Sequence, residues 1–225
     1  MPYPVASLSK AVTAMCLNGL LAQSTHGWST PLSDLGEVWE NIGMAPHPEL
    51  AKLPLSVLAT HTSGLPKNID ADETAGERRN LYTQINFARE ALRDPRHQSD
   101  KRTHSYSNVN FPLLGQIIEC MTGEACSDVC YRTTMAPAGA ADASMWATAG
   151  FGGWIVSAQD YARFVMHWHH PSRPWMQAPH KFSYDRDSGA GLGVYHQFSA
   201  GEHTLIRSGL WRSAPPPRAA SARSL

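Results

Sequence analysis

The chain carries no net charge, because its 19 Lys and Arg residues are balanced by 19 Asp and Glu residues. A chain without a positive surplus has no bulk attraction to phosphate backbones, so we expect no nucleic acid among its partners. Long hydrophobic runs are also missing: the longest mostly apolar stretch, around residues 15–22, is too short to cross a bilayer. We therefore expect no integral membrane segment. With 225 residues, the chain is long enough for a domain with its own core.

Cysteine is scarce, with four residues in the chain, and no two of them form a C-x-x-C pair. Cys126 and Cys130 are four residues apart, so they would lie on one face of a helix. They could bind a metal ion, but no second pair completes a zinc site. We therefore predict that Cys16, Cys120, Cys126 and Cys130 are buried free thiols.

Three histidines, His167, His169 and His170, lie around Trp168. His167 and His170 are three residues apart and could bind a metal ion from one helix face. No carboxylate or cysteine lies near them in the sequence. We predict no metal site and no cofactor, and keep metal binding by these histidines as an alternative.

The sequence has no G-x-S-x-G motif, which excludes the nucleophile elbow of an α/β-hydrolase. Lysine is rare: of five lysines, only Lys10 has a serine three residues before it, Ser7. We predict a helix over residues 7–22, in which one turn brings Ser7 and Lys10 to the same face. A lysine whose pKa is lowered by burial can take the proton of a nearby serine hydroxyl. The pair is therefore a candidate nucleophile and base.

A second candidate element, Tyr106-Ser107-Asn108, comes just before a helix that we predict over residues 112–121, with Gly123 as its C-cap. Of the seven tyrosines, only Tyr106 has an asparagine two residues later. A tyrosine close to a lysine can act as a phenolate base, and an asparagine amide can bind a substrate amide. The alternative is an ordinary loop tyrosine followed by an Asn turn.

Hydrophobic spacing and turn residues predict the other elements. We expect helices at 54–60, 85–92 and 157–168, turns at 61–66 and 151–153, and strands at 191–198 and 203–210.

This order of elements is typical of an α+β fold, in which helices pack on a small antiparallel sheet. The last segment, residues 212–225, consists of Ala, Pro, Ser, three Arg and one Leu. Such a segment buries too little apolar surface to offset its ordering entropy. We therefore predict one domain over residues 1–211 and a disordered tail over residues 212–225.

The chain contains, in this order, the strings ASLSKAVTA, LPLSVLATHTSGLP, YSNVNFPLLGQIIECMTG, GGWIVSAQDYARF and GLGV. Together these strings resemble the serine β-lactamase-related family, which contains class C β-lactamases, penicillin-binding DD-peptidases, D-aminopeptidases and related esterases. The resemblance runs from about Val5 to Leu210. It implies a β-lactamase/transpeptidase-like fold and a serine hydrolase that works through an acyl-enzyme.

Under this resemblance, Ser7 corresponds to the nucleophile and Lys10 to the lysine that activates it. Tyr106 corresponds to the tyrosine that passes a proton between nucleophile and leaving group, and Asn108 to the asparagine that binds the amide of the acyl side chain. The implied partner is a small-molecule or cell-wall-peptide-like substrate: a β-lactam, a D-amino-acid peptide or an ester. His61 lies outside this catalytic set, and we expect a structural hydrogen bond to be its role.

The third element of the family is Lys or His, then Thr or Ser, then Gly, on a strand that lines the site. The best match here is Arg207-Ser208-Gly209, which departs from the pattern at its first residue. Arginine keeps a cation for a substrate carboxylate, and its planar fork suits bidentate binding. The resemblance implies an oxyanion hole formed by the N–H groups of Ser7 and Leu210.

The resemblance breaks at both ends of the chain. Family members have strands and a helix before the S-x-x-K helix, whereas six residues precede Ser7 here. They also have two strands and a long helix after the third element, where this sequence continues into the 212–225 segment. We therefore expect a domain whose antiparallel sheet is incomplete. The alternative function is a catalytically incompetent remnant of the family, or a weak ligand-binding protein; the compartment stays open.

Overall fold

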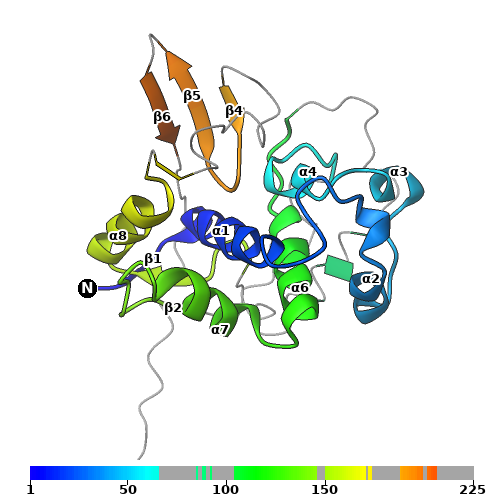
Figure 1. Cartoon of the computed structure of the whole chain (residues 1–225), viewed down its shortest axis with the longest axis horizontal. Helices are drawn as coiled ribbons and strands as arrows, with labels where there is room; N and C mark the ends of the chain where they lie inside the picture. Colours follow the sequence, from blue (N-terminus) through cyan, green and yellow to red (C-terminus); the bar gives the residue numbers. More distant parts are fainter. Residues whose placement is uncertain are drawn as a thin grey trace, which may run out of the picture.

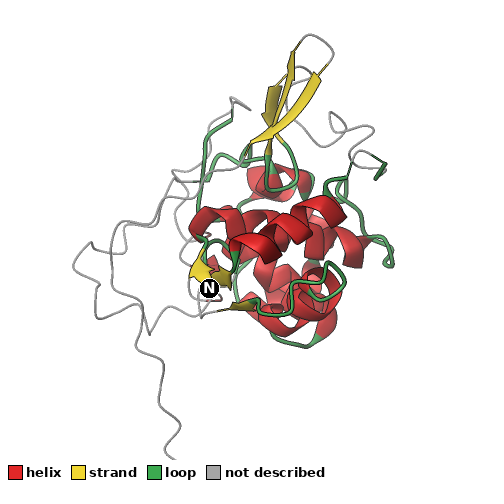
Figure 2. Ribbon diagram, turned by 90° about the vertical axis from the view of Figure 1, so that its left-hand side faces the viewer, coloured by secondary structure: helices red, strands yellow, loops and turns green. Residues whose placement is uncertain are grey.

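The computed structural model describes residues 1–65, 85, 88–89, 92, 104–145, 150–170, 172–173, 188–199 and 202–206. Helices gather around a central helix, α1 (Ser9–Leu21), and a three-stranded sheet stands at one end of this helical part (Figure 1). Seen from a second side, the sheet projects beyond the helices (Figure 2). The predicted α+β arrangement is confirmed. The predicted tail at 212–225 lies outside the described residues.

The central helix α1 follows a single turn of 3-10 helix, η1 (Ala6–Leu8), and together they confirm the helix predicted over residues 7–22. Ten of the thirteen α1 residues are buried, including the polar residues Ser9, Lys10 and Thr13. A helix that is buried on nearly all sides is apolar all round instead of amphipathic, which matches this sequence. The first turn of α1 is therefore enclosed by other parts of the chain.

The second core helix, α6 (Asn110–Thr122), packs against α1 and ends at Gly123, the predicted C-cap, with φ of +69°. It begins two residues before the predicted start. The other described helical segments are η2 (Leu32–Asp34), α2 (Gly36–Ile42), α3 (Pro48–Ala51), α4 (Ser56–Ala59), α7 (Cys126–Cys130), the π-helical η4 (Tyr131–Met135) and α8 (Ala158–Trp168).

These segments confirm the other predicted helices to different extents. The helix predicted at 54–60 is α4, and the one at 157–168 is α8. Ser157 caps α8, since its Oγ accepts a hydrogen bond from the N–H of Asp160 at 3.0 Å. Within the predicted helix at 85–92, the four described residues are helical.

A first small antiparallel sheet has the order β1-β3-β2. Its strands are β1 (Tyr3–Pro4), β2 (Ser144–Met145) and β3 (Trp154–Val156). Tyr3 pairs with Val156, and the chain then runs from β1 into η1. The sheet thus joins the start of the helical core to a segment about 150 residues later. Sequence analysis did not predict it, because strands of two or three residues are too short to show an alternating pattern.

A second antiparallel sheet has the order β4-β5-β6. Its strands are β4 (Ser188–Ala190), β5 (Tyr195–Ser199) and β6 (Glu202–Ile206). The strand predicted at 191–198 is confirmed only from Tyr195, because residues 191–194 form the turn between β4 and β5. Of the strand predicted at 203–210, the described part belongs to β6, and residues 207–210 lie outside the described residues.

The prediction of four free thiols is wrong for one pair, since Cys16 and Cys130 form a disulfide with a Cα–Cα distance of 5.1 Å. These cysteines are 114 residues apart, so no local sequence pattern could indicate the pairing. They meet because α1 packs against α7. Cys120 and Cys126 are not part of this disulfide and keep their thiols, as predicted. The predicted shared helix face is confirmed, because Cys126 Sγ lies 3.7 Å from Cys130 Sγ. The disulfide ties the central helix to α7.

Metal binding by the histidines at 167–170 receives no support. Among the described residues, no three His, Cys, Asp or Glu side chains are placed to hold a metal ion. His169 is instead a core residue: it is 7% exposed, and its ring lies edge-on to Phe164 at 5.5 Å between centroids. Neither of its ring nitrogens has a hydrogen-bond partner in the described part of the chain.

The buried His169 is expected to make stability depend on pH. Burial lowers the pKa of His169 to about 4, whereas an unfolded chain binds this proton near pH 6.5. Between these values the unfolded state binds more protons, so the free energy of unfolding should fall by about 2 to 3 kcal/mol as the pH drops from 7.5 to 4.5. Replacing His169 with Phe should remove this component, as measured by urea unfolding at both pH values.

The neighbouring variant His170→Phe is the control for this measurement, because His170 is exposed. It should keep the wild-type difference in unfolding free energy between the two pH values. An unchanged difference in His169→Phe would show that this imidazole does not couple folding to protons.

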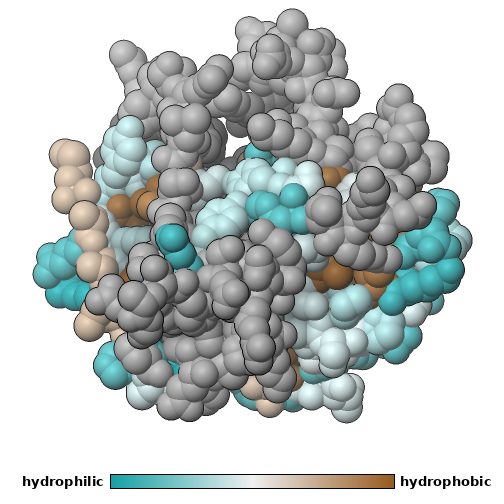
Figure 3. Space-filling model, turned by 90° about the horizontal axis from the view of Figure 1, so that it is seen from above, coloured by the Kyte–Doolittle hydropathy of each residue, from teal (hydrophilic) through white to brown (hydrophobic). Residues whose placement is uncertain are grey.

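The described surface is mixed in character. Seen from above, both hydrophobic and hydrophilic side chains are visible on this face (Figure 3). Within the described part of the chain, no helix combines the length and apolar composition needed to cross a membrane.

Candidate active site

Three predicted site residues from two distant segments meet in the structure. Ser7 lies in η1, Lys10 in the first turn of α1, and Tyr106 in the loop before α6, 99 residues after Ser7. Ser7 Oγ and Tyr106 Oη are hydrogen-bonded at 2.8 Å, and Lys10 Nζ donates to Ser7 Oγ at 3.1 Å. The prediction that Ser7 and Lys10 share a face is confirmed. The serine oxygen is therefore within proton-transfer distance of both an amine and a phenol.

The Lys10 side chain is fully buried, with 0% of its surface exposed. Its Nζ also donates to the backbone carbonyl of Phe151 at 2.8 Å. Three aromatic rings surround the nitrogen at 5.3 Å for Tyr106, 5.5 Å for Phe111 and 5.6 Å for Phe151, measured to the ring centroids. These contacts hold the lysine nitrogen in one place, against Ser7.

The turn predicted at 151–153 lies against the start of α1 and positions it. Besides the Phe151 carbonyl, the carbonyl of Gly150 accepts a hydrogen bond from Thr13 Oγ1 at 2.8 Å. Ser9 Oγ accepts one from the N–H of Trp154 at 3.1 Å. The predicted turn is confirmed. The buried polar residues of α1 are thus used to fix the helix relative to β3.

Asn108, the predicted amide-binding residue, is half-buried in the same loop as Tyr106. Its backbone carbonyl accepts a hydrogen bond from the N–H of Phe111 at 3.4 Å, so it stands at the first turn of α6. The predicted Arg207, Ser208, Gly209 and Leu210 lie outside the described residues, directly after β6.

Gly193, in the turn between β4 and β5, was not predicted as a site residue. A Cβ atom at this position would lie 2.5 Å from the carbonyl oxygen of Lys10 and 2.8 Å from Ala11 Cα. Its φ is +71°, a region that favours glycine. The β4–β5 turn thus rests directly on the backbone of the lysine in the candidate site. In the sequence, the string GLGV at residues 191–194 was the feature that could have pointed to Gly193.

His61 is closer to the site than predicted. The expected structural hydrogen bond is confirmed, since His61 Nδ1 accepts from the N–H of Ser107 at 3.2 Å. The expectation that His61 lies away from the catalytic set is wrong, because its ring centroid is 4.5 Å from that of Tyr106. On its other side, His61 meets His104 edge-on at 5.8 Å, and burial lowers the pKa of His104. His104 in turn lies 5.6 Å from the ring of Tyr195 in β5.

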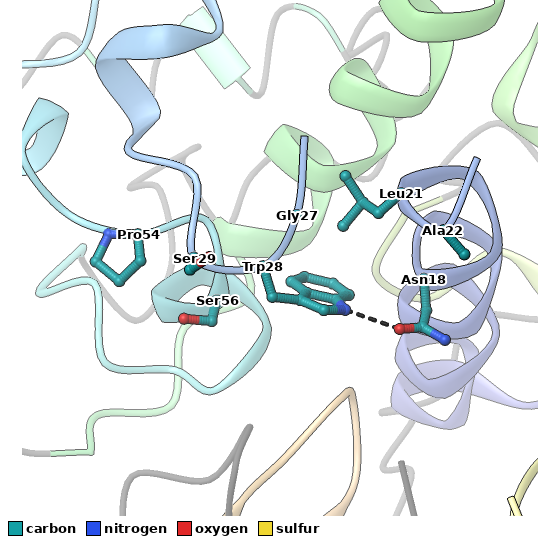
Figure 4. Close-up of a pocket in the computed structure, with 8 residues that line it drawn as sticks. All are labelled: Asn18, Leu21, Ala22, Gly27, Trp28, Ser29, Pro54 and Ser56. Carbon is teal, nitrogen blue, oxygen red and sulfur yellow. Dashed lines mark hydrogen bonds between the residues drawn. The ribbon is translucent and has the colours of Figure 1, made fainter. Parts of the chain in front are cut away.

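A separate cavity of about 410 Å³ lies at the other end of α1 (Figure 4). There Asn18 Oδ1 accepts a hydrogen bond from Trp28 Nε1 at 2.9 Å. The lining residues are Asn18, Leu21, Ala22, Gly27, Trp28, Ser29, Pro54 and Ser56, none of which belongs to the predicted site. Asn18 is eight residues, or more than two helical turns, beyond Lys10. This cavity is therefore distinct from the cluster around Ser7.

The fold is that of the β-lactamase/transpeptidase class. A penicillin-binding protein from Bacillus halodurans superposes with a TM-score of 0.71 at 18% identity, covering 90% of this chain and 71% of that chain. A D-stereospecific amidohydrolase from Streptomyces sp. gives 0.72 at 18% identity, with 93% and 75% covered. An octameric penicillin-binding protein homologue from Pyrococcus abyssi gives 0.74 at 16% identity, with 93% and 57% covered.

The family model described as Beta-lactamase matches residues 1–214, and the chain belongs to this family. The structures with this fold include proteins described as a D-stereospecific amidohydrolase and a D-amino acid amidase. Among curated proteins, Protein flp of Staphylococcus aureus (strain MRSA252) is 24% identical over 123 residues, which are 55% of this chain and 24% of that protein. The chain thus spans about a quarter of the length of this curated relative.

Proposed function

We propose that the chain is a serine hydrolase that works through an acyl-enzyme, with Ser7 as the nucleophile. The observation that carries the proposal is the hydrogen-bonded trio of Ser7, Lys10 and Tyr106, with the lysine fully buried. A hydroxyl is a weak nucleophile until a neighbouring base takes its proton, and this trio offers two such groups at 3.1 Å and 2.8 Å.

In the proposed reaction, Ser7 Oγ attacks the substrate carbonyl carbon while its proton moves to Lys10 Nζ or Tyr106 Oη. The tetrahedral intermediate expels the leaving group, which takes up that proton through Tyr106, and an ester on Ser7 remains. Water then attacks this ester, releases a proton along the same route to Ser7 Oγ, and frees the acid. Each proton taken from a nucleophile is thus returned to a leaving group.

Substrate binding is proposed for residues near the site and directly after β6. Asn108 would bind an amide of the acyl side chain, and Arg207 would bind a carboxylate, with Ser208 and Gly209 on the same segment. The N–H groups of Ser7 and Leu210 would stabilise the oxyanion. The substrate class that fits these groups is a β-lactam, a D-amino-acid peptide or an ester. We propose residues 1–211 as the hydrolase domain and residues 212–225 as a tail.

The second candidate is a family member without a competent site, at best a weak binder of the same ligands. The departure at Arg207, where the family has Lys or His, favours it. The two candidates differ in one property: only the hydrolase forms a covalent bond at Ser7.

Labelling with a fluorescent penicillin and with a fluorophosphonate tests the proposal. We expect one equivalent of label per folded chain, which intact mass spectrometry and peptide mapping would place on Ser7. Ser7→Ala should take up none. Ser29→Ala, a change of an exposed serine, should label like the wild type. A folded wild-type chain that reacts with neither reagent, or a Ser7→Ala variant that still reacts, would overturn the proposal in favour of the second candidate.

A further inference from the structure

His61 accepts hydrogen bonds from the backbone on both sides of Tyr106. The carbonyl oxygen of His61 accepts a hydrogen bond from the N–H of Ser105 at 2.8 Å. Its Nδ1 accepts one from the N–H of Ser107 at 3.2 Å. The backbone N–H groups of the residues before and after Tyr106 are therefore both held by one residue, which comes from the turn after α4.

The His61 ring also packs on the Tyr106 ring. The two centroids are 4.5 Å apart with 37° between the ring planes, and Phe111 lies 5.4 Å from His61. His61 is 1% exposed, so its ring has no room to move away. Backbone and ring contacts together determine where the Tyr106 hydroxyl lies, which is 2.8 Å from Ser7 Oγ.

The imidazole is held in a defined tautomer. Because Nδ1 accepts from Ser107, it carries no proton, and the neutral ring has its proton on Nε2. Asn110 Nδ2 lies 3.3 Å from the same Nδ1, and Asn110 Oδ1 accepts from Ser63 Oγ at 2.7 Å. The turn that contains His61 is thus connected to the first residue of α6.

His61 adopts an unusual backbone conformation, with φ of +58°. This region is disfavoured for residues that have a Cβ atom, and a buried residue remains in it only when its surroundings hold it there. In this position, the positive φ directs both the carbonyl and the ring of one residue toward the segment 105–107.

We propose that His61 is a positioning residue for Tyr106, and that it sets the distance between the phenol and Ser7 Oγ. This inference rests on the proposed function, in which Tyr106 carries the proton to the leaving group. A displacement of about 1 Å at a reacting group can reduce a rate about 100-fold. His61 therefore affects the acylation rate through Tyr106 and has little influence on how tightly a substrate binds.

The test replaces His61 with Asn or with Leu, two residues whose side chains have nearly the same shape. His61→Asn tolerates positive φ and offers Oδ1 as an acceptor near the position of Nδ1, whereas His61→Leu has no acceptor. We expect His61→Leu to lower the saturating rate of Ser7 labelling by about 10- to 100-fold and to change the half-saturating concentration of the reagent less than about threefold. His61→Asn should restore the rate to within about threefold of the wild type. His26→Leu, in a half-buried loop position, is the control.

Hydrogen exchange of the Ser105 and Ser107 amides gives a second readout that does not require activity. Both amides should be protected in the wild type, and Ser107 should lose protection in His61→Leu and keep it in His61→Asn. If His61→Leu does not fold, His61→Gly, which also tolerates this φ, takes its place. A wild-type chain that labels Ser7, together with a folded His61→Leu that labels equally fast, would overturn the positioning role alone. If the wild type does not label at Ser7, the proposed function itself fails. Unprotected Ser105 and Ser107 amides in the wild type would also overturn the positioning role.

Discussion

Replacing Gly193 with Ala is expected to detach the β4–β5 turn from α1 and to slow Ser7 labelling at least about 100-fold. The new Cβ would lie 2.5 Å from Lys10 O and 2.8 Å from Lys10 C and Ala11 Cα. All three are backbone atoms of a buried helix, so they cannot move aside as the end of a flexible side chain would. The positive φ of +71° adds strain for any residue with a Cβ. Together these effects should reduce the free energy of unfolding by about 2 to 5 kcal/mol.

Gly123→Ala separates the clash from the backbone strain. Gly123 has nearly the same φ, +69°, but a Cβ there would meet nothing within 4 Å. Its replacement should cost about 1 to 2 kcal/mol through φ alone and leave labelling of Ser7 unchanged. Urea unfolding and labelling time courses measure both quantities. Equal losses of unfolding free energy and of labelling rate in Gly193→Ala and Gly123→Ala would contradict the close approach of Gly193 to the helix that carries Lys10.

The relation between Ser7 and Lys10 could be predicted because they are three residues apart on a continuous helical segment, in which η1 leads into α1. The same reasoning gave the start of α8 at residue 157 and the end of α6 at Gly123, since each depends on residues within one turn. The contact of Tyr106 with Ser7 is different. The two residues are 99 positions apart, and only the resemblance to a family, not spacing, pointed to it.

Features that depend on distant packing could not be predicted. The Cys16–Cys130 disulfide joins helices that are adjacent only in the folded chain. The predicted strand at 191–198 included a turn because Leu192 and Val194 continue the apolar pattern on both sides of Gly193, whose φ is visible only in the structure. His61 was assigned a structural hydrogen bond, which is correct. Its contact with Tyr106 depends on a positive φ that histidine adopts rarely.

The site is assembled from three segments whose connections are made by buried polar groups. η1 and α1 carry Ser7 and Lys10, the turn at 150–154 holds α1 through Thr13, and the turn after α4 holds the Tyr106 loop. The buried polar side chains of α1, Ser9, Lys10 and Thr13, each have a named hydrogen-bond partner in the turn at 150–154, and an unpaired one would be costly. A change in any of the three segments is therefore expected to alter the geometry around Ser7 Oγ before it alters the fold as a whole.

Replacing Lys10 with Met is expected to slow Ser7 labelling by about a thousandfold, the size of effect that a general base provides. Met keeps an unbranched apolar stem among Tyr106, Phe111 and Phe151, and its sulfur makes favourable contacts with aromatic rings. The Phe151 carbonyl loses its donor, which costs about 1 to 3 kcal/mol, but a buried amine is removed at the same time. The variant should therefore stay folded, as measured by thermal unfolding, while its labelling rate falls.

Two comparisons make the result specific to Lys10. Lys52→Met removes an exposed lysine that pairs with Glu49 at 2.6 Å, and it should label at the wild-type rate. Tyr106→Phe removes the other hydrogen-bond partner of Ser7 Oγ and keeps the ring that His61 contacts. If Lys10→Met labels as fast as the wild type while Tyr106→Phe does not, the phenol is the base that activates Ser7, and the buried lysine serves to hold it. A large loss in Lys10→Met with a smaller one in Tyr106→Phe assigns activation to the amine, because the proton then reaches Nζ without passing through Oη.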